Sequence, residues 1–212
     1  MAVHYRTRGF VIKKTGRGEA DQLFTIYTQD FGKLEVLGKA VRKIKSKLRG
    51  GIGLFYLSEI EFIQGKKTKT LTGAILIEKF PNIRKSLKKL AVAHKIAENL
   101  DDSVRGQEPD KKTWELLIET FGKLNNLQFK INHLPLVYYY FLWNFISILG
   151  YRPEFKDCLL NGQKIACDIV KVLKLILRKD WPILSRLKIQ PLHQKLLKNV
   201  SQDYLSEILG RN

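Results

Sequence analysis

Residues 38–53 read GKAVRKIKSKLRGGIG, and the N-terminal part of the chain is organised around this stretch. Sequence with the alternation of β-strands precedes it (LFTIYT, LEVLG) and follows it (FYLSEIEFI). No acidic residue occurs between Glu35 and Glu59. We therefore expect a long, flexible, cationic loop between two strands. Loops of this length inside a compact domain are uncommon and are usually functional or disordered.

The charge of this loop indicates a polyanionic ligand, most often a nucleic acid. A solvated charge run is the commoner fate of basic stretches. We favour binding because the charge has one sign throughout and the flanking glycines let the backbone follow a ligand. The predicted DNA-binding cations come from this loop and from two neighbouring turns: Arg17, Lys39, Arg42, Lys43, Lys45, Lys47, Arg49, Lys66, Lys67 and Lys69.

The composition is that of a basic chain with enough apolar residues for a folded core. The chain has 212 residues, of which 44% are hydrophobic, and a formal net charge of +18 at pH 7. It can hold one large or two modest domains, and wholesale disorder is not expected. Residues 1–80 contain 16 basic and 7 acidic residues, so they carry +9. Such a field favours encounters with phosphate backbones, although a membrane surface or an acidic protein would also satisfy it.

The cysteines and the apolar segments fit a protein of the reducing cytosol. Cys158 and Cys167 do not make a disulfide framework. The chain begins MAVHYRTRGF, which lacks the apolar core of a signal peptide. Residues 134–150 are uncharged, but they are shorter than the ~20 residues of a membrane span and contain Pro135 and Asn144. We expect a buried core helix there, and no membrane association.

Residues 1–80 show the period-2 alternation of strands separated by turn residues. Turns are expected at Thr15–Gly18, Asp30–Gly32 and Gly65–Lys69. The expected strands are residues 3–14, 23–28, 34–37, 55–64 and 71–78. Five short strands within about eighty residues favour a small barrel.

After residue 80 the apolar residues recur with a helical period. Helices are expected at residues 83–100, 111–124, 134–149 and 165–177, and two short helices end the chain. The last of these is expected to begin at Ser201 as N-cap, and residues 151–163 read as irregular. The predicted class is α+β, with a five-stranded barrel in residues 1–80 and an all-α domain in residues 81–212. The boundary is expected near Phe80–Pro81.

A set of residues spread over almost the whole chain resembles a known family. It starts with GFVIKKTGRGEADQLFTIYTQDFGKLEVLGKAVRKIKSKLRG, from Gly9 onward. The matching features are Gly9-Phe10-Val11, Glu19 and Asp21 after a glycine turn, Thr28, Phe31-Gly32-Lys33, Gly38-Lys39 and Ser46. Downstream, the Phe80-Pro81 junction, AVAHKIAENL, TWELLIETFGKL and FLWNFISILGYRPEFKDC agree. This ordered set resembles the RecO family of bacterial recombination mediators, whose N-terminal domain is an OB-fold.

The resemblance implies a cytoplasmic, nucleoid-associated DNA-repair protein that is not an enzyme. Proteins of this family bind single- and double-stranded DNA and anneal complementary strands. They bind the acidic C-terminal tail of single-strand-binding protein, and with a RecR-type partner they help RecA displace that protein. The resemblance therefore implies a recombination mediator that has DNA, a RecR-type protein and the acidic tail as partners, and RecA as an indirect one.

One departure from the family concerns zinc. The family usually carries a four-cysteine zinc site in its helical domain, C-x-x-C-G followed by a second C-x-x-C. Here Asn161 stands at the second ligand position after Cys158, and Val170 stands three residues after Cys167. The zinc-binding region at about 151–170 is therefore degenerate, and we expect neither zinc nor another cofactor.

Residue patterns typical of catalysis are weak in this chain. Glu19 and Asp21 could act as paired carboxylates, but capping of backbone groups or pairing with Arg17 is the stronger interpretation. The histidines lack metal-ligand spacing: His4, His94, His133 and His193. A nuclease or phosphotransferase would need a carboxylate cluster, which the sequence does not show.

Aromatic residues of the barrel add candidates for base stacking. The pool is Phe10, Phe24, Tyr27, Phe31, Phe55, Tyr56 and Phe62. Most must fill the core, and one or two are expected on the surface. The sequence leaves open which rings these are and which strand type is preferred. An RNA-binding OB protein and a basic scaffold for acidic protein tails remain the alternatives.

Overall fold

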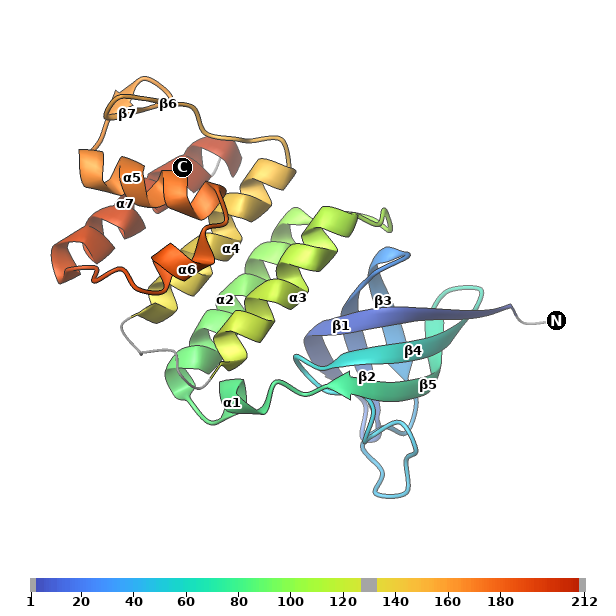
Figure 1. Cartoon of the computed structure of the whole chain (residues 1–212). Coiled ribbons are helices and arrows are strands. Elements are labelled where there is room, and N and C mark those ends of the chain that lie inside the picture. Colours follow the sequence, from blue (N-terminus) through green and yellow to red (C-terminus); the bar gives the residue numbers. More distant parts are fainter. Residues whose placement is uncertain (1–2, 127–132, 210–212) are drawn as a thin grey trace. The chain divides into compact units, whose positions relative to one another are not determined.

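The chain folds into two compact units. A computed structural model describes residues 3–126 and 133–209 (Figure 1). Unit 1 comprises Met1–Glu115 and unit 2 comprises Leu116–Asn212. The secondary structure changes from strands to helices near residue 80, whereas the division between the units falls inside a helix. The change in secondary structure near Phe80–Pro81 therefore does not coincide with the division between the units, and a domain boundary at Phe80–Pro81 stays a prediction.

Unit 1 is built on a closed five-stranded barrel. Its strands are β1 (His4–Arg17), β2 (Asp21–Thr28), β3 (Gly32–Gly38), β4 (Leu57–Gln64) and β5 (Lys69–Glu78). They close in the order β1-β2-β3-β5-β4, with β3 and β5 parallel and the other neighbours antiparallel. This confirms the barrel that the sequence predicts, although β1 runs to Arg17 and not only to Lys14.

The alternation of apolar residues along the strands fills the barrel with side chains. In β4, for example, Ile60 and Phe62 are buried while Glu59 and Glu61 stay partly exposed. The core cluster consists of Val11, Phe24, Ile26, Leu34, Val36, Val41, Ile52, Ile60, Phe62 and Leu71. Two of its members, Val41 and Ile52, come from the long loop and not from a strand.

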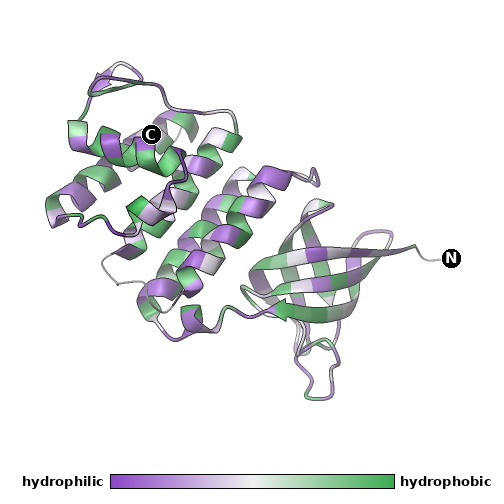
Figure 2. Ribbon diagram, viewed as in Figure 1, coloured by the Kyte–Doolittle hydropathy of each residue, from purple (hydrophilic) through white to green (hydrophobic). Residues whose placement is uncertain are grey.

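The loop of residues 39–56 is a succession of hydrogen-bonded turns. The N–H groups of Lys43, Ser46 and Arg49 each bond to the carbonyl three residues earlier, at 3.0–3.3 Å. Figure 1 shows the loop extending from one end of the barrel, and Figure 2 shows it coloured mostly hydrophilic. Because Val41 and Ile52 anchor it in the core, the loop is less free than the flexible connection that we expect from the sequence.

The two ends of this loop lie directly against the barrel, and glycines make that possible. A Cβ at Gly38 would lie 2.5 Å from the Val41 side chain, and one at Gly51 would lie 1.9 Å from the Ala74 carbonyl oxygen. Ser58 also donates a hydrogen bond to the Gly51 carbonyl oxygen at 2.5 Å. These glycines are therefore needed for close approach, and not only for the freedom that the sequence suggests.

Unit 1 continues with helices that follow the barrel. They are α1 (Pro81–Arg84), α2 (Leu87–Ser103) and the first turn of α3 (Lys111–Asn125). Asp101 of α2 lies 3.1 Å from the Lys33 ammonium and 3.2 Å from that of Lys13. Burial by itself raises the pKa of Asp101, but the hydrogen bonds and charges of the two lysines outweigh it and hold the pKa below its ordinary 3.8.

Unit 2 is organised around the apolar helix α4 (Leu134–Ile148). Eleven of its residues are buried, as the sequence predicts for a core helix. Asn144, a buried polar residue of this helix, donates to the carbonyl oxygens of Tyr140 and Ile176 at 2.8 and 3.0 Å. The helices that follow are α5 (Cys167–Leu177), α6 (Trp181–Leu184) and α7 (Pro191–Leu209). Within the described residues, no helix is both long enough and apolar enough to cross a membrane.

Ser201 does not begin a helix, so its predicted role as N-cap is wrong. It lies within α7 and is buried. Its hydroxyl donates to the Leu197 carbonyl oxygen at 2.7 Å and accepts from the Trp143 indole N–H at 3.0 Å. Serine is not favoured in the middle of a helix. At this position it is stabilised by the hydrogen bond from the Trp143 indole of α4.

The segment expected to be irregular forms a small antiparallel sheet, so the second half of the chain is not purely helical. Its strands are β6 (Phe155–Lys156), β7 (Leu159–Leu160) and β8 (Gln163–Lys164). Asn161 and Gly162, with φ of 46° and 84°, form the two-residue turn between β7 and β8. Such a turn needs positive φ at both positions, which Asn-Gly adopts readily.

We predict that Asp101→Asn lowers the free energy of unfolding by about 1–2 kcal/mol at pH 7, because Lys33 and Lys13 lose a partly buried carboxylate partner. A depressed pKa means that the carboxylate stabilises the fold above pH 3.8, and that this contribution is lost as the pH falls through the depressed value. Chemical denaturation at pH 7 and over a series of pH values that continues well below 3.8 measures both. The exposed Glu98→Gln is the matched control, and a pH-independent gap between wild type and D101N would contradict the assignment.

Candidate nucleic-acid interface

The cations of the long loop all point into solvent. The exposed members are Lys39, Arg42, Lys43, Lys45, Lys47 and Arg49. Val41 and Ile52 of the same loop are committed to the barrel core, and Leu48 packs against it. The loop therefore holds Val41 and Ile52 in the core and presents its charges, together with the exposed side chain of Ile44, to solvent.

The first part of the loop is fastened to the β1–β2 turn. The Arg42 N–H donates to the Ala20 carbonyl oxygen at 3.0 Å, and the Ala40 N–H donates to Asp21 Oδ1 at 2.7 Å. The Arg42 guanidinium reaches the Glu19 carbonyl oxygen at 3.5 Å. Two stretches of predicted cations, one around Arg17 and the other from residue 39 onward, are thus neighbours in space.

The β4–β5 turn lies close to the β1–β2 turn, because residues of both turns line one cavity of about 310 Å³. Arg17, Lys67 and Lys69, which the sequence predicts as DNA-binding residues, all line it. Lys33 lines it as well and was not predicted, since it belongs to β3 and not to a turn or to the basic loop. Glu35 is the acidic residue in the wall. A phosphate group could meet several cations here at once, which is what release of condensed counterions requires.

The predicted cations do not all contribute equally to this geometry. Arg17, Lys66 and Lys67 are exposed, and Lys69 is partly covered at the start of β5. Lys66 is exposed in the same turn, outside the residues that line the cavity. Lys33 is paired with Asp101, so it is the least free of the cavity's cations to bind a phosphate.

Most of the aromatic pool fills the core. Five rings are buried: Phe10, Phe24, Tyr27, Phe55 and Phe62. Phe31 is partly exposed but packs edge-on against Tyr5 and Phe62, with ring centroids 5.6 and 5.7 Å apart. Tyr56, at the end of the long loop, is also partly exposed.

The acidic and histidine side chains singled out in the sequence lie apart in the structure, and His193 lies 3.9 Å from Asp168 on the surface of unit 2. Asp21 accepts from a backbone N–H, in line with the capping role that the sequence favours. His94 is exposed at the barrel boundary, with its ring 5.0 Å from that of Phe55. Across residues 3–126 and 133–209, no three His, Cys, Asp or Glu side chains are placed to hold a metal ion.

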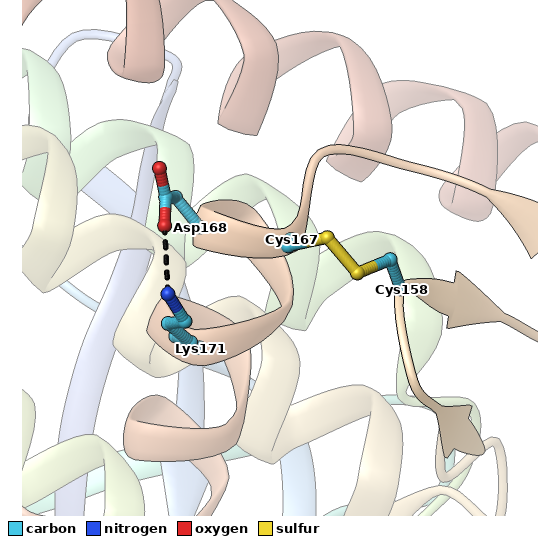
Figure 3. The surroundings of a disulfide bond; sticks show 4 residues. All are labelled: Cys158, Cys167, Asp168 and Lys171. Carbon is cyan, nitrogen blue, oxygen red and sulfur yellow. Dashed lines mark hydrogen bonds and ion pairs between the residues drawn. A yellow bond between two sulfur atoms is a disulfide. The ribbon is translucent and has the colours of Figure 1, made fainter.

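The region where the family resemblance implies zinc does not fit that metal. Cys158, at the β6–β7 turn, and Cys167, the first residue of α5, form a disulfide, so neither thiolate is available (Figure 3). The sequence favours a reducing environment for these two cysteines and does not predict this bond, so the disulfide departs from that expectation. Asn161 is occupied with Glu154, since its Oδ1 accepts from the Glu154 N–H and its own N–H donates to the Glu154 carbonyl oxygen, both at 2.9 Å. Val170 is buried.

Comparison with known proteins agrees with the barrel and the helices. The family model described as "Recombination protein O N terminal" matches residues 1–80, and "Recombination protein O C terminal" matches residues 84–169. A DNA repair protein RecO from Dehalococcoides mccartyi is 31% identical over an alignment that covers 87% of this chain and 83% of that protein.

Other relatives carry the same name at lower identity. The protein from Acetivibrio thermocellus is 29% identical over 76% of this chain, and the one from Nostoc sp. is 27% identical over 77%. The matched parts cover 63% and 56% of these two proteins, so the chain spans less than two thirds of their length.

We predict that the purified protein contains no stoichiometric zinc and that Cys158 and Cys167 are paired in the absence of reductant. Without thiolate ligands the metal cannot raise the stability of the native state, so a chelator leaves the melting temperature unchanged. Mass spectrometry after alkylation under denaturing conditions should add no group before reduction and two after it. Near-stoichiometric zinc that survives dialysis would contradict the first statement, and alkylation of the cysteines before reduction would contradict the second.

Proposed function

The chain belongs to the RecO family, and from this membership we propose that it is a DNA-repair and recombination protein that binds single- and double-stranded DNA through its barrel. Within the family the expected role is that of a mediator. The protein anneals complementary strands and helps to load a recombinase onto strands covered by single-strand-binding protein. The role is one of binding, without a catalytic site.

One observation carries this proposal. Cations from three separate stretches, the β1–β2 turn, the long loop and the β4–β5 turn, are gathered on one barrel. Arg17 connects them, because its turn contacts the loop and its side chain shares a cavity with Lys67 and Lys69. OB-folds bind oligonucleotides across a barrel face and the loops at its rim, and these cations occupy such loops.

The physical basis of annealing would be charge neutralisation. Two DNA strands repel each other through their phosphates, and cations bound along one strand lower that repulsion. The exposed loop offers six cations within sixteen residues, so a bound strand keeps little net charge along this stretch. A second strand can then approach closely enough to pair, while the released counterions favour binding at low salt.

The proposed partners beyond DNA are a RecR-type protein, the acidic C-terminal tail of single-strand-binding protein and, indirectly, RecA. Residues 182–199 support the second of these. This stretch contains no acidic residue, exposes Arg186, Lys188, Lys195 and Lys198, and exposes the apolar side chains of Ile183 and Leu192. Exposed cations beside exposed apolar side chains are complementary to an acidic peptide that ends in an apolar residue.

We predict that log K for single-stranded DNA falls with log salt at a slope of roughly −4 if about six phosphates are contacted. Replacing Arg42, Lys43, Lys45 and Lys47 by alanine should flatten that slope by about 3 units and slow annealing, because four phosphate contacts are lost. Fluorescence anisotropy across a salt series measures the slope. These side chains are exposed, so the fold should be unaffected.

The matched control removes the same charge elsewhere. Lys111, Lys112, Lys171 and Lys198 are equally exposed and lie outside the barrel, so their replacement by alanine should leave the slope nearly unchanged. Equal slopes for wild type and the loop variant would overturn the assignment of the loop. Preference for RNA over DNA of the same sequence would favour the RNA-binding alternative.

We also predict that a labelled acidic tail peptide ending in an apolar residue binds the 212-residue chain at low salt. The Arg186→Glu, Lys188→Glu, Lys195→Glu variant should weaken this binding at least tenfold, because the surface then repels the peptide. DNA affinity is the control readout and should change far less. If the triple variant binds the peptide as well as wild type does, the surface is wrongly placed.

A further inference from the structure

Tyr56 stands apart from the other aromatic residues of unit 1. Of the seven rings expected as a pool, five are buried and Phe31 packs against two other rings. Tyr56 lies at the junction of the cationic loop and β4, and its ring is partly exposed. It is therefore the ring of that pool best placed for a ligand that the loop has bound.

The backbone before Tyr56 turns this ring outward. Phe55 adopts φ of 59°, in the left-handed region that non-glycine residues rarely enter. Its side chain is buried, with its ring 6.5 Å from that of Phe10. The ring of Phe55 therefore lies in the core, whereas the ring of the next residue, Tyr56, lies at the surface. Backbone conformations of this kind are costly and are found disproportionately at functional sites.

The surroundings of the Tyr56 ring are cationic. The Arg84 guanidinium carbon lies 5.0 Å from the ring centroid, and the Lys79 ammonium lies 5.8 Å from it. Both side chains are exposed, and Arg84 also donates to the Leu54 carbonyl oxygen, which fixes it at the end of the loop. Neither cation was predicted from the sequence, because each follows β5 and is separated from the loop by more than twenty residues.

The loop backbone is shaped to the same ring. A Cβ at Gly53 would lie 3.0 Å from the Tyr56 ring, so any other residue there would push against it. The Tyr56 N–H donates to the Gly53 carbonyl oxygen at 3.0 Å and closes a tight turn. The ring is thereby held in one position before a ligand arrives, which reduces the ordering cost of binding.

We propose that Tyr56, Arg84 and Lys79 form a base-stacking site for single-stranded nucleic acid, at the end of the path that the loop cations define. The nucleobase stacks on the tyrosine ring or on the guanidinium plane beside it, and the flanking phosphate pairs with Lys79. This inference rests on the proposed function, and it adds a contact with bases to contacts that otherwise involve only phosphates. The site favours unpaired strands, because bases in a duplex have no free face.

Stacking and phosphate contacts respond differently to salt, and this separates the two proposals. Loss of a phosphate contact changes the slope of log K against log salt, whereas loss of stacking lowers log K equally at every salt concentration. Tyr56→Leu should therefore weaken oligo-dT binding about tenfold with an unchanged slope, and Tyr56→Phe should bind like wild type. The exposed Tyr151→Leu is the matched control and should have no effect.

An oligonucleotide of the same length that lacks bases provides a second test. The affinity of wild type for this oligonucleotide should fall to that of Tyr56→Leu for oligo-dT, because no base remains to stack. Equal affinity of wild type and Tyr56→Leu for oligo-dT would overturn the stacking site, while the salt slope of the loop variant still reports on the proposed function. Absence of DNA binding by wild type would overturn both.

A crosslink keeps the proposal testable if Tyr56→Leu does not fold. Wild-type protein bound to an oligonucleotide with 5-iododeoxyuridine is irradiated, and the modified peptide is identified by mass spectrometry. Attachment at Tyr56 is the expected result. Attachment confined to other aromatic residues would show that the base stacks elsewhere.

Discussion

The barrel closes through a very short parallel pairing of β3 with β5, and the rest of unit 1 depends on how this weak seam is covered. Only two positions are paired, Val36 with Lys69 and Leu37 with Thr70. Beyond them the loop supplies what a strand would, since Gly51 lies against Ala74 of β5 and Ile52 enters the core. Val41 and Ile52 of the loop are used for closure, and the residues between them, among them most of its cations, are left on the outside. The charged surface is thus a consequence of how the barrel is sealed.

The sequence predicts those parts of the fold that have a clear periodicity. The five strands and the long helices follow from alternation and from the 3.6-residue period, because burial of one face is what each element needs. The three strands of two residues each in unit 2 are too short to show a period. The Asn161-Gly162 pair was nevertheless a usable signal for a hairpin. Ser201 misleads because its partner, Trp143, is 58 residues away, and such a pairing leaves no local trace.

In the candidate site, too, the sequence predicts what depends on neighbouring residues and misses what depends on packing between distant parts of the chain. Contiguous runs of cations are visible in the sequence, and the structure brings Arg17 together with Lys67 and Lys69. Lys33, Lys79 and Arg84 lie outside the basic loop and the two turns, and they are placed near these cations by β3, β5 and α1. The cysteine pair was missed for a related reason: Cys158 and Cys167 could be read as remnants of a metal site, and only the turn of β6 and β7 shows that they meet.

The long loop is also the place where we expect a trypsin-like protease to cleave this protein. Such enzymes cleave after lysine and arginine in exposed chain, and six of these residues lie within the sixteen from Gly38 to Gly53. A cut there separates β1–β3 from β4 and everything after it. The two pieces would nevertheless stay together, because β1 in the first piece pairs with β4 in the second at seven positions. The expected product is a nicked but intact barrel, in which a bound polyanion would shield the cut site.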